Sequence, residues 1–264
     1  MTDAPNTALP LRIALVGTGR MGQAVEAVAA ERGHAVVARF DETNPLLDAR
    51  DPSALHGADV CVDFSVPDVA LDQIHQYAFW GVDAVVGTTG WTDHLDNVAG
   101  WVDEGQNGLL WAPNFSIGVA LVVRALRGLL PLLDRFDEYD AAVHEIHHVH
   151  KLDSPSGTAL RLADELLGGL GRKSHIEPET QHGAIAADAL HVTAARLGSV
   201  FGEHTVTLDS PVDTIEITHR AKDRRAFAVG AVRAAEWVRG RQGLFTLDDM
   251  LEATTGTGRD AERE

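Results

Sequence analysis

Short apolar runs alternate with longer amphipathic segments through the first half of the chain. The runs are rich in Val, Ala, Leu and Ile, and we expect strands over residues 11–16, 34–40, 58–64, 83–86 and 108–112. Segments of helical composition lie between them, over residues 21–31, 67–80 and 92–104. Ser65 is expected to cap the second of these helices, with Pro67 in its first turn. Because strands that alternate with helices at this spacing form a parallel sheet covered on both faces, we predict an α/β fold with an N-terminal Rossmann-type sheet.

The second half of the chain has a different order of elements. Helices are expected over residues 117–133, 158–167 and 227–239, and strands over residues 189–196, 204–209 and 214–220. Those three strands follow one another without helices between them, which predicts a second α+β domain with a mixed sheet. We therefore expect a dinucleotide-binding domain over residues 1–115 and a substrate-binding and oligomerisation domain over residues 116–236. Residues 237–264 are expected to pack back on the first domain, with a polar tail from residue 254.

Composition narrows the class of protein. The 264 residues carry a formal charge of −17 and one cysteine. A single cysteine excludes a disulfide framework and a cysteine-based zinc site. The negative charge disfavours nucleic acid and anionic membranes as partners, because both are polyanions. No apolar run approaches the roughly 20 residues that span a bilayer, and no signal peptide is visible. We expect a cytoplasmic globular protein.

A glycine-rich turn lies between the first expected strand and the first expected helix. The segment Gly17-Thr-Gly-Arg-Met-Gly22 has the form G-x-G-x-x-G. In a dinucleotide site the first glycine makes the tight turn, the second lets the pyrophosphate approach, and the third lets the helix pack on the strand. The helix N-terminus adds N–H groups and the positive end of its dipole. The turn predicts a pyrophosphate site, with a purely structural turn as the alternative.

An acidic residue follows this turn at the distance that dinucleotide sites use. Asp41 ends the second expected strand, about 20 residues after the turn, where a carboxylate bonds the ribose 2′-hydroxyl. A carboxylate at this position repels a 2′-phosphate, so we expect NADH to be preferred over NADPH. Arg39 shares a strand face with Asp41 and offers such a phosphate some compensation.

A histidine-rich segment contains a literal match to the H-E-x-x-H zinc-protease signature. On a helix, His144 and His148 would share one face and bind zinc, with Glu145 as the general base and Glu165 or Asp164 as a possible third ligand. The β-branched and aromatic content of residues 136–149 suits a strand at least as well. In a strand the two histidines lie too far apart to share one metal. A zinc hydrolase is therefore the less favoured interpretation.

The same segment also offers acid–base chemistry. Histidine titrates near neutral pH, and Lys151 supplies a fixed cation. The following residues open a helix whose first N–H groups, at Gly157 and Thr158, are expected to face the region of His148 and Lys151. Such a set suits carboxylate oxygens of a substrate, and a solvated loop is the plainer alternative.

Several separate stretches resemble the 4-hydroxy-tetrahydrodipicolinate reductase (dihydrodipicolinate reductase) family of lysine and diaminopimelate biosynthesis. They span most of the chain in the family's order, and the most specific is His-His-x-x-Lys followed by Pro-Ser-Gly-Thr. The stretches are Val16–Gly22, Asp63–Ser65, Val86–Gly90, Ala112–Val119, Glu145–Thr158 and Glu216–Arg220.

The resemblance implies a role for each matching residue. His147 is implied as the catalytic acid/base and Lys151 as the proton donor, and His148, Gly157 and Thr158 as ligands of a cyclic dicarboxylate. The implied cofactor ligands are Gly17, Thr18, Gly19, Arg20, Met21, Gly22, Asp41, Gly87, Thr88, Thr89, Ala112, Pro113, Asn114 and Phe115. Members use NADH or NADPH to pass hydride to ring C4 while the 4-hydroxyl leaves as water. They bind no metal in this stretch and are usually homotetramers built through the second domain's sheet.

Three features depart from many relatives, and other functions stay open. The glycine turn is one residue shorter, and Glu42 follows Asp41 where a basic residue is common, which strengthens the expectation of NADH. Ser154 replaces the usual alanine. The alternatives are another nicotinamide-dependent dehydrogenase of a small carboxylate, a non-catalytic nucleotide sensor, and the zinc hydrolase above.

Overall fold

The computed structural model describes residues 9–254, and the chain divides into two compact units. The first unit contains the chain up to Ser116 and again from Phe227, and the second unit is Ile117–Ala226. The sequence placed the return to the first unit at residue 237, whereas the return begins at residue 227 in the structure. The expected polar tail falls largely outside the described residues.

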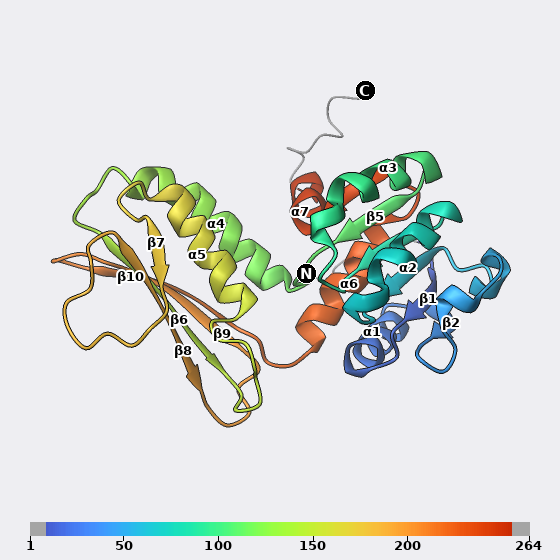
Figure 1. Ribbon diagram of the computed structural model, residues 1–264, viewed down its shortest axis with the longest axis horizontal. Coiled ribbons are helices and arrows are strands. Elements are labelled where there is room, and N and C mark those ends of the chain that lie inside the picture. The colour runs from blue at the N-terminus through green and yellow to red at the C-terminus, as the bar shows by residue number, and fades with distance from the viewer. Residues whose placement is uncertain (1–8, 255–264) are drawn as a thin grey trace, which may run out of the picture. The chain divides into compact units, whose positions relative to one another are not determined.

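The first unit is built on a six-stranded sheet whose neighbouring strands are all parallel (Figure 1). In spatial order the strands are β11 (Gly243–Thr246), β5 (Gly108–Trp111), β4 (Asp83–Val86), β3 (Val60–Asp63), β1 (Arg12–Val16) and β2 (Ala35–Phe40). The chain runs outward from β1 to β2 and then returns to the other side of β1 for β3. This reversal of direction is the point at which open α/β sheets bind their ligands.

Helices cover both faces of this sheet. They are α1 (Arg20–Glu31), α2 (Pro67–Phe79), α3 (Leu95–Gly105), α6 (Arg225–Val238) and α7 (Leu247–Thr254), with short 3-10 turns at Leu46–Asp48, Pro52–Leu55 and Thr92–His94. Every residue of β3 is buried, as is nearly all of β1. The predicted Rossmann-type sheet is therefore confirmed, and its central strands β1 and β3 are buried on both faces, as a sheet covered by helices on both sides requires.

The start of α2 differs from the expectation. Val66 rather than Ser65 is the N-cap residue, and Pro67 is the first helical residue, as predicted. The Ser65 hydroxyl instead donates to the side-chain oxygen of Gln73 at 2.7 Å. The Ser65 backbone N–H is bonded to the Asp63 carboxylate at 2.9 Å. The hydroxyl that could have capped the helix is thus used, with the N–H, to fix the turn after β3.

The second unit is a five-stranded mixed sheet with two helices on one face (Figure 1). The strand order is β10 (Thr214–Arg220), β9 (Glu203–Asp209), β6 (Asp140–His147), β8 (Ala189–Arg196) and β7 (His175–Glu177). The covering helices are α4 (Ile117–Leu133) and α5 (Gly157–Gly169). β6 pairs antiparallel with β9 and parallel with β8, so the prediction of a mixed sheet is confirmed.

Alternation along β6 decides which histidines face the core. Val143, Glu145 and His147 are buried on the side covered by the helices, whereas His144 is exposed. Since successive side chains of a strand point to opposite faces, His144 and His147 cannot act together.

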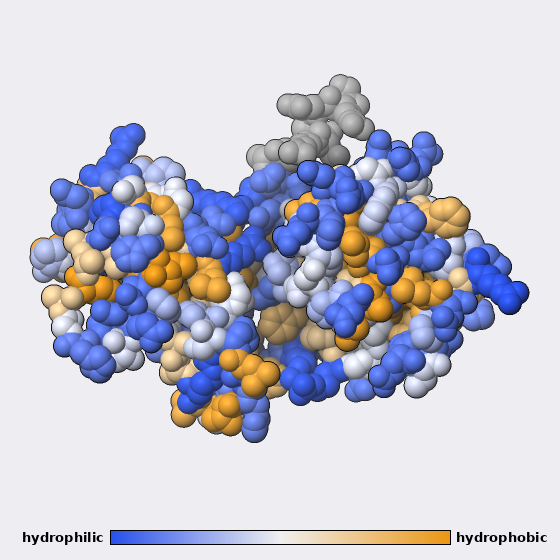
Figure 2. Space-filling model, in the orientation of Figure 1, coloured by the Kyte–Doolittle hydropathy of each residue, from blue (hydrophilic) through white to orange (hydrophobic). Residues whose placement is uncertain are grey.

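None of the helices within residues 9–254 is long and apolar enough to cross a bilayer. The face of the protein seen in Figure 2 carries mainly hydrophilic residues, with hydrophobic residues in small groups.

Candidate functional site

The glycine turn after β1 has the geometry of a phosphate cradle. Gly17 adopts a φ of +89°, and a Cβ added to it would lie 2.3 Å from the Phe64 carbonyl oxygen. A Cβ on Gly22 would lie 2.1 Å from the Gly17 carbonyl oxygen. A Cβ on Gly19 would instead meet nothing within 4 Å, and α1 has no side-chain cap. The turn is thus closed toward the protein at Gly17 and Gly22 and open at Gly19, where the N–H groups of the first turn of α1 face outward.

Asp41 lies at the end of β2 and is held by donors from two segments. Its carboxylate accepts from the Thr18 hydroxyl at 2.8 Å, the Thr43 hydroxyl at 2.7 Å and the Thr43 N–H at 2.9 Å. These hydrogen bonds, that of the Thr43 hydroxyl first, lower the pKa of Asp41 to about 2. Asp41 is therefore a fixed anion beside the glycine turn at neutral pH.

Arg39 does not point its charge toward a 2′-phosphate. Its guanidinium pairs with Glu26 of α1, and the Nε to Oε2 distance is 3.3 Å. The positive charge with which Arg39 was expected to compensate a 2′-phosphate is therefore already paired with another carboxylate. Glu42 places a further acidic residue in the wall of the cavity beside Asp41.

A cavity of about 570 Å³ lies at the carboxyl ends of β1, β2 and β3. Its lining includes Gly17, Thr18, Gly19, Asp41 and Phe64. The cavity extends from the open side of the glycine turn to Asp41, the candidate ribose ligand, as the binding of a dinucleotide requires.

The remaining cofactor candidates follow β4 and β5 at the same edge of the sheet. Thr88 is buried and donates to the Asp63 carboxylate at 3.0 Å, and Thr89 is exposed. The Phe64 ring lies against Gly87, where a Cβ would be 2.1 Å away, and meets the Phe115 ring edge-on at 5.8 Å. Ala112, Pro113 and Asn114 follow β5 directly.

Asp63 organises this edge of the first unit. It is fully buried and accepts from the Tyr77 hydroxyl at 2.8 Å in addition to Thr88 and Ser65. Burial raises the pKa of Asp63, and these hydrogen bonds oppose the increase.

In the second unit, the acid–base candidates lie on one strand, the loop after it and the helix that follows. His147 ends β6 and is nearly buried, and Lys151 lies in the loop with its ammonium 2.8 Å from the Asp153 carboxylate. Ser156 caps α5 by accepting the Ala159 N–H at 3.2 Å, so Gly157 and Thr158 form the first turn of that helix. The His148 ring lies 6.3 Å from that of His150, and its Nδ1 is buried without a hydrogen-bond partner.

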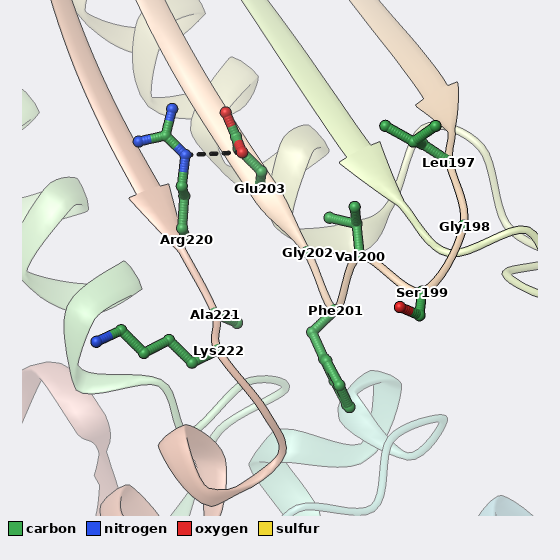
Figure 3. Close-up of a pocket in the computed structure, with 10 residues that line it drawn as sticks. All are labelled: Leu197, Gly198, Ser199, Val200, Phe201, Gly202, Glu203, Arg220, Ala221 and Lys222. Atoms are coloured by element: carbon green, nitrogen blue, oxygen red, sulfur yellow. Dashed lines mark ion pairs between the residues drawn. The ribbon is translucent and has the colours of Figure 1, made fainter.

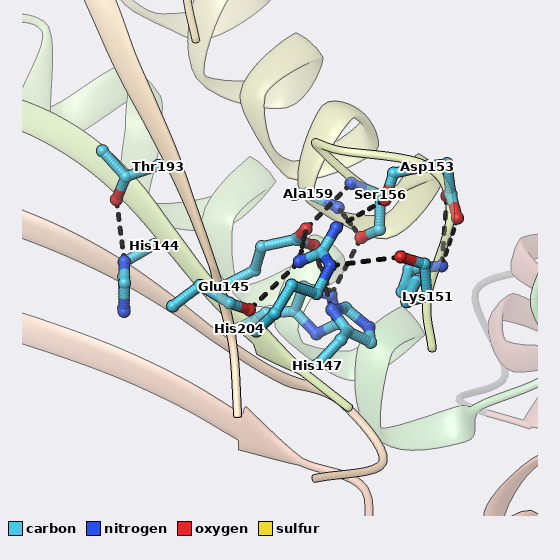
Figure 4. Close-up of polar contacts among 11 residues, drawn as sticks. His144, Glu145, His147, Lys151, Asp153, Ser156, Ala159, Thr193 and His204 are labelled. Carbon is cyan, nitrogen blue, oxygen red and sulfur yellow. Dashed lines mark hydrogen bonds and ion pairs between the residues drawn. The ribbon is translucent and has the colours of Figure 1, made fainter. Parts of the chain in front are cut away.

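A buried carboxylate connects these pieces (Figure 4). Glu145 Oε1 accepts from the Ser156 N–H at 3.1 Å and from Arg196 Nη1 at 3.4 Å. Its Oε2 lies 3.3 Å from His147 Nδ1 and 3.5 Å from His204 Nε2. Burial raises the pKa of Glu145, but the nearby His204 imidazole, then Ser156 and the charge of His147, outweigh it and lower that pKa to about 2.

His147 is uncharged at neutral pH in this surrounding. Burial lowers its pKa to about 4, and the cations Lys151 and Arg196 act in the same direction as burial. The charge of Glu145 opposes the shift without overcoming it.

Arg196 and His204 belong to the site, although sequence reasoning missed both. Arg196 also donates to the Asp153 carbonyl at 2.6 Å and to the Lys151 carbonyl at 3.4 Å, so it ties the loop to the sheet. His204 stands in the buried row of β9 with Val206 and Leu208. A histidine in an otherwise apolar row was the signal available in the sequence.

The segment between Arg196 and His204 borders a second cavity of about 370 Å³ (Figure 3). Residues 197–203 and 220–222 line it, and a Cβ on Gly202 would lie 2.9 Å from His147 Nε2. Lys222 contributes a cation, while Arg220 is paired with Glu203 at 2.7 Å.

The H-E-x-x-H interpretation is wrong in its geometry. Residues 140–147 form a strand, so His144 and His148 are not one helical turn apart, and His144 Nδ1 is 2.7 Å from the Thr193 hydroxyl. Glu165 is paired with Arg127 instead of approaching these histidines. Within residues 9–254, Glu145, His147 and His204 bring possible metal-binding atoms within 4.8 Å of one another, and Arg196 already lies against that carboxylate.

The first unit has a parallel sheet with an open glycine turn, and the second has a buried histidine followed by a loop with a lysine. Together these features define the class of two-domain, nucleotide-dependent oxidoreductases. Comparison with known proteins identifies the family of this chain. The N-terminal dihydrodipicolinate reductase family matches residues 11–115, and the C-terminal one matches residues 118–251. The chain belongs to the dihydrodipicolinate reductase family, which confirms the resemblance found in the sequence.

Individual relatives agree with this assignment. The chain is 37% identical over 241 residues to 4-hydroxy-tetrahydrodipicolinate reductase of Christiangramia forsetii, covering 91% of this chain and 98% of that protein. It is 34% identical to the enzyme of the same name from Laribacter hongkongensis, covering 91% and 98%. A dipicolinate-bound dihydrodipicolinate reductase from Paenisporosarcina sp. TG-14 matches with a TM-score of 0.73 and 25% identity, covering 90% of this chain and 98% of that chain.

Proposed function

We propose that this protein reduces 4-hydroxy-tetrahydrodipicolinate to tetrahydrodipicolinate, with a nicotinamide dinucleotide as the hydride donor, in lysine and diaminopimelate biosynthesis. The observation that carries the proposal is the strand–loop–helix of the second unit. It places His147 on a strand end, Lys151 in the loop and Gly157 at a helix N-terminus within one short stretch of chain. The match to the family covers both units and does not favour another dehydrogenase or a hydrolase.

The first unit supplies the cofactor site in this proposal. The open side of the turn at Gly19, the uncapped N-terminus of α1 and the adjoining cavity fit a pyrophosphate, and Asp41 fits the adenosine ribose. The bound dinucleotide supplies hydride. Gly87, Thr88, Thr89 and residues 112–115 would line the nicotinamide end.

NADH is the cofactor that the described residues favour. Asp41 is ionised at neutral pH, Glu42 adjoins it, and the Arg39 guanidinium is paired with Glu26. A 2′-phosphate would meet the Asp41 carboxylate with Glu42 beside it, while the guanidinium of Arg39 is already paired.

The second unit binds the cyclic dicarboxylate and handles protons. His148 and the first-turn N–H groups at Gly157 and Thr158 would bind carboxylate oxygens, because a helix N-terminus attracts anions. Lys151 would give the proton that leaves with the 4-hydroxyl as water while ring C4 receives hydride. One substrate molecule, one hydride and one proton then yield tetrahydrodipicolinate and water.

Assembly and location complete the proposal. The face of the five-stranded sheet opposite α4 and α5 bears partly or fully exposed residues such as His144, Thr193 and Thr205, which supports a homotetramer built through this sheet. Light scattering during size-exclusion chromatography tests that state. We place the enzyme in the cytoplasm, where its single cysteine stays reduced.

A coupled assay with freshly made 4-hydroxy-tetrahydrodipicolinate tests the activity. We expect oxidation of NADH that depends on this substrate. Oxidation with other small keto acids but none with this compound would refute the proposal.

A further inference from the structure

Glu145 is a buried acid to which the proposed chemistry gives no role. Its side chain is fully buried on the face of β6 that α5 covers. An ionised carboxylate is costly to bury unless charged or hydrogen-bonding partners compensate for the lost water. Each of its two oxygens has a separate set of partners, and the two sets indicate what the residue does.

The first oxygen fixes the carboxylate in space. Oε1 accepts from the Ser156 N–H at the start of α5 and from Arg196 at the end of β8. Arg196 in turn holds the carbonyls of Lys151 and Asp153. The carboxylate therefore has little freedom to rotate away from the strand and the loop that bear His147 and Lys151.

The second oxygen faces two imidazoles. Oε2 is 3.3 Å from His147 Nδ1 and 3.5 Å from His204 Nε2, close charge contacts that lack the alignment of hydrogen bonds. Ser156 Oγ lies 3.2 Å from the same nitrogen of His204, so His204 has a second partner. For His147, Glu145 is the group that faces Nδ1.

We infer that Glu145 is a positioning residue that keeps the proton of His147 on Nδ1 and leaves Nε2 with a lone pair. The negative charge of an ionised carboxylate attracts a proton on the nitrogen that faces it, so it favours that tautomer of the neutral imidazole. The opposite tautomer would place the Nδ1 lone pair against a negative charge. This inference rests on the proposed role of His147 in the reaction.

The charges around His147 agree with a neutral ring. The groups that face it are Glu145 on its own strand, His204 on β9, Lys151 in the loop and Arg196 on β8. Burial first, and then the neighbouring cations, lower the pKa of His147 to about 4, while the low pKa of Glu145 keeps that residue ionised. His147 then enters the cycle as a neutral ring with a lone pair on Nε2, and Lys151 is the group that carries the proton that leaves with the 4-hydroxyl as water.

The surroundings of Nε2 are consistent with this direction. A Cβ on Gly202 would lie 2.9 Å from Nε2, so glycine at this position keeps a side chain from pressing against that nitrogen. Figure 4 shows the Nδ1 side of the ring turned toward Glu145.

Nitrogen NMR of the whole protein with ¹⁵N-labelled histidine tests the tautomer directly. The His147 signals are assigned by their loss in His147→Gln. We expect coupling patterns of the Nδ1–H form, with no titration of His147 between pH about 6 and 8, since its pKa is about 4. A predominant Nε2–H form, or a cationic ring at neutral pH, would overturn the inference. This readout needs no turnover, so it fails independently of the proposed activity.

Kinetics of Glu145→Gln test the consequence for catalysis. We expect kcat to fall about 10²- to 10⁴-fold, the range for losing a correctly protonated acid–base group, with the substrate KM within about threefold of the wild-type value. Glu145 raises the pKa of His147, so its neutralisation should move the acid limb of the kcat profile to lower pH. An unmoved acid limb, or equal losses in cofactor binding and kcat, would show a merely structural role and overturn the inference.

Two controls complete the design. Glu165→Gln makes the same change at a carboxylate of the same unit that also bonds an arginine, and we expect wild-type kcat and an unmoved pH profile. Chelator treatment should leave the wild-type activity intact. Activity that requires an added divalent metal would overturn the inference, because the metal would occupy the nitrogen to which we assign the proton.

Discussion

Two alanine substitutions in the glycine turn should separate folding from cofactor binding. In Gly22→Ala the new Cβ would lie 2.1 Å from the Gly17 carbonyl oxygen and 3.4 Å from a Leu15 methyl group. The first distance is far inside the roughly 3.5 Å at which nonbonded atoms come to rest. Because the obstacle is main chain rather than a flexible side chain, the turn itself must move.

The magnitude follows from two opposing effects. Overpacking of this kind costs about 1–3 kcal/mol, and replacing glycine by alanine within a helix returns about 0.5–1 kcal/mol. We expect Gly22→Ala to lose about 1–2 kcal/mol of unfolding free energy in the first unit. NADH affinity should also fall about tenfold or more, because the displaced turn carries the N–H groups that face the pyrophosphate.

Gly19→Ala is the matched control, because it should weaken NADH binding without a loss of stability. A Cβ on Gly19 meets nothing within 4 Å, and its φ of −67° suits alanine. Stability should stay within about 0.5 kcal/mol of the wild type. The NADH Kd should rise at least about tenfold, since the methyl group would stand where the pyrophosphate approaches the backbone.

Denaturant unfolding followed by tryptophan fluorescence provides the stability measurement. All five tryptophans lie in the part of the chain that forms the first unit, so the signal reports on that unit: Trp80, Trp91, Trp101, Trp111 and Trp237. Titration with NADH gives the affinities. Wild-type stability in Gly22→Ala, or unchanged NADH affinity in Gly19→Ala, would refute this account of the turn.

Further predictions concern catalysis, cofactor choice and stability. His147→Gln should lower kcat about 10²- to 10⁴-fold while NADH binding stays intact, and an unchanged kcat would remove His147 from the mechanism. Lys151→Ala should lower kcat similarly and raise the substrate KM, as steady-state kinetics can show. The wild-type enzyme should have a kcat/KM at least about tenfold higher with NADH than with NADPH, which is a difference of about 1.4 kcal/mol. Asp41→Asn should bring the two kcat/KM values closer together. A tenfold bias of the wild type toward NADPH would contradict the expected preference. Tyr77→Phe should cost about 1–3 kcal/mol, because it leaves a buried oxygen of Asp63 without its donor at 2.8 Å; denaturant unfolding measures the loss, and wild-type stability would exclude it.

The parallel sheet of the first unit was predictable because its signals are local. Apolar runs, glycine turns and the strand–helix alternation are all read within short windows of sequence. β11 and α7 were not predicted because they lack such local signals. β11 is only Gly243–Thr246, is only partly buried, and owes its place to pairing with β5, more than a hundred residues earlier in the chain.

The cofactor turn and the network around Glu145 differ in how far apart their parts lie in the sequence. Gly17 to Gly22 carry the turn's geometry within one continuous segment, so a motif identifies it. The partners of Glu145 come from three strands and a helix cap, and register rather than spacing brings Arg196 and His204 to it. A single sequence does not contain that register, although His204 in an apolar row hints at a buried polar partner.

The chemistry of the histidine segment depends on whether it forms a helix or a strand. On a helix, residues four apart share a face, so His144 and His148 would meet and Glu145 would be free to act as a general base. On a strand, residues two apart share a face, so Glu145 and His147 meet instead, and His144 turns to the other face. The same letters therefore describe a metal site in one conformation and a carboxylate–imidazole pair in the other. The antiparallel partner β9 then adds His204 to the buried side, opposite Glu145 in the register. The second unit's acid–base site thus depends on the strand period of β6, and a variant that kept every histidine but disturbed that register would be expected to lose it.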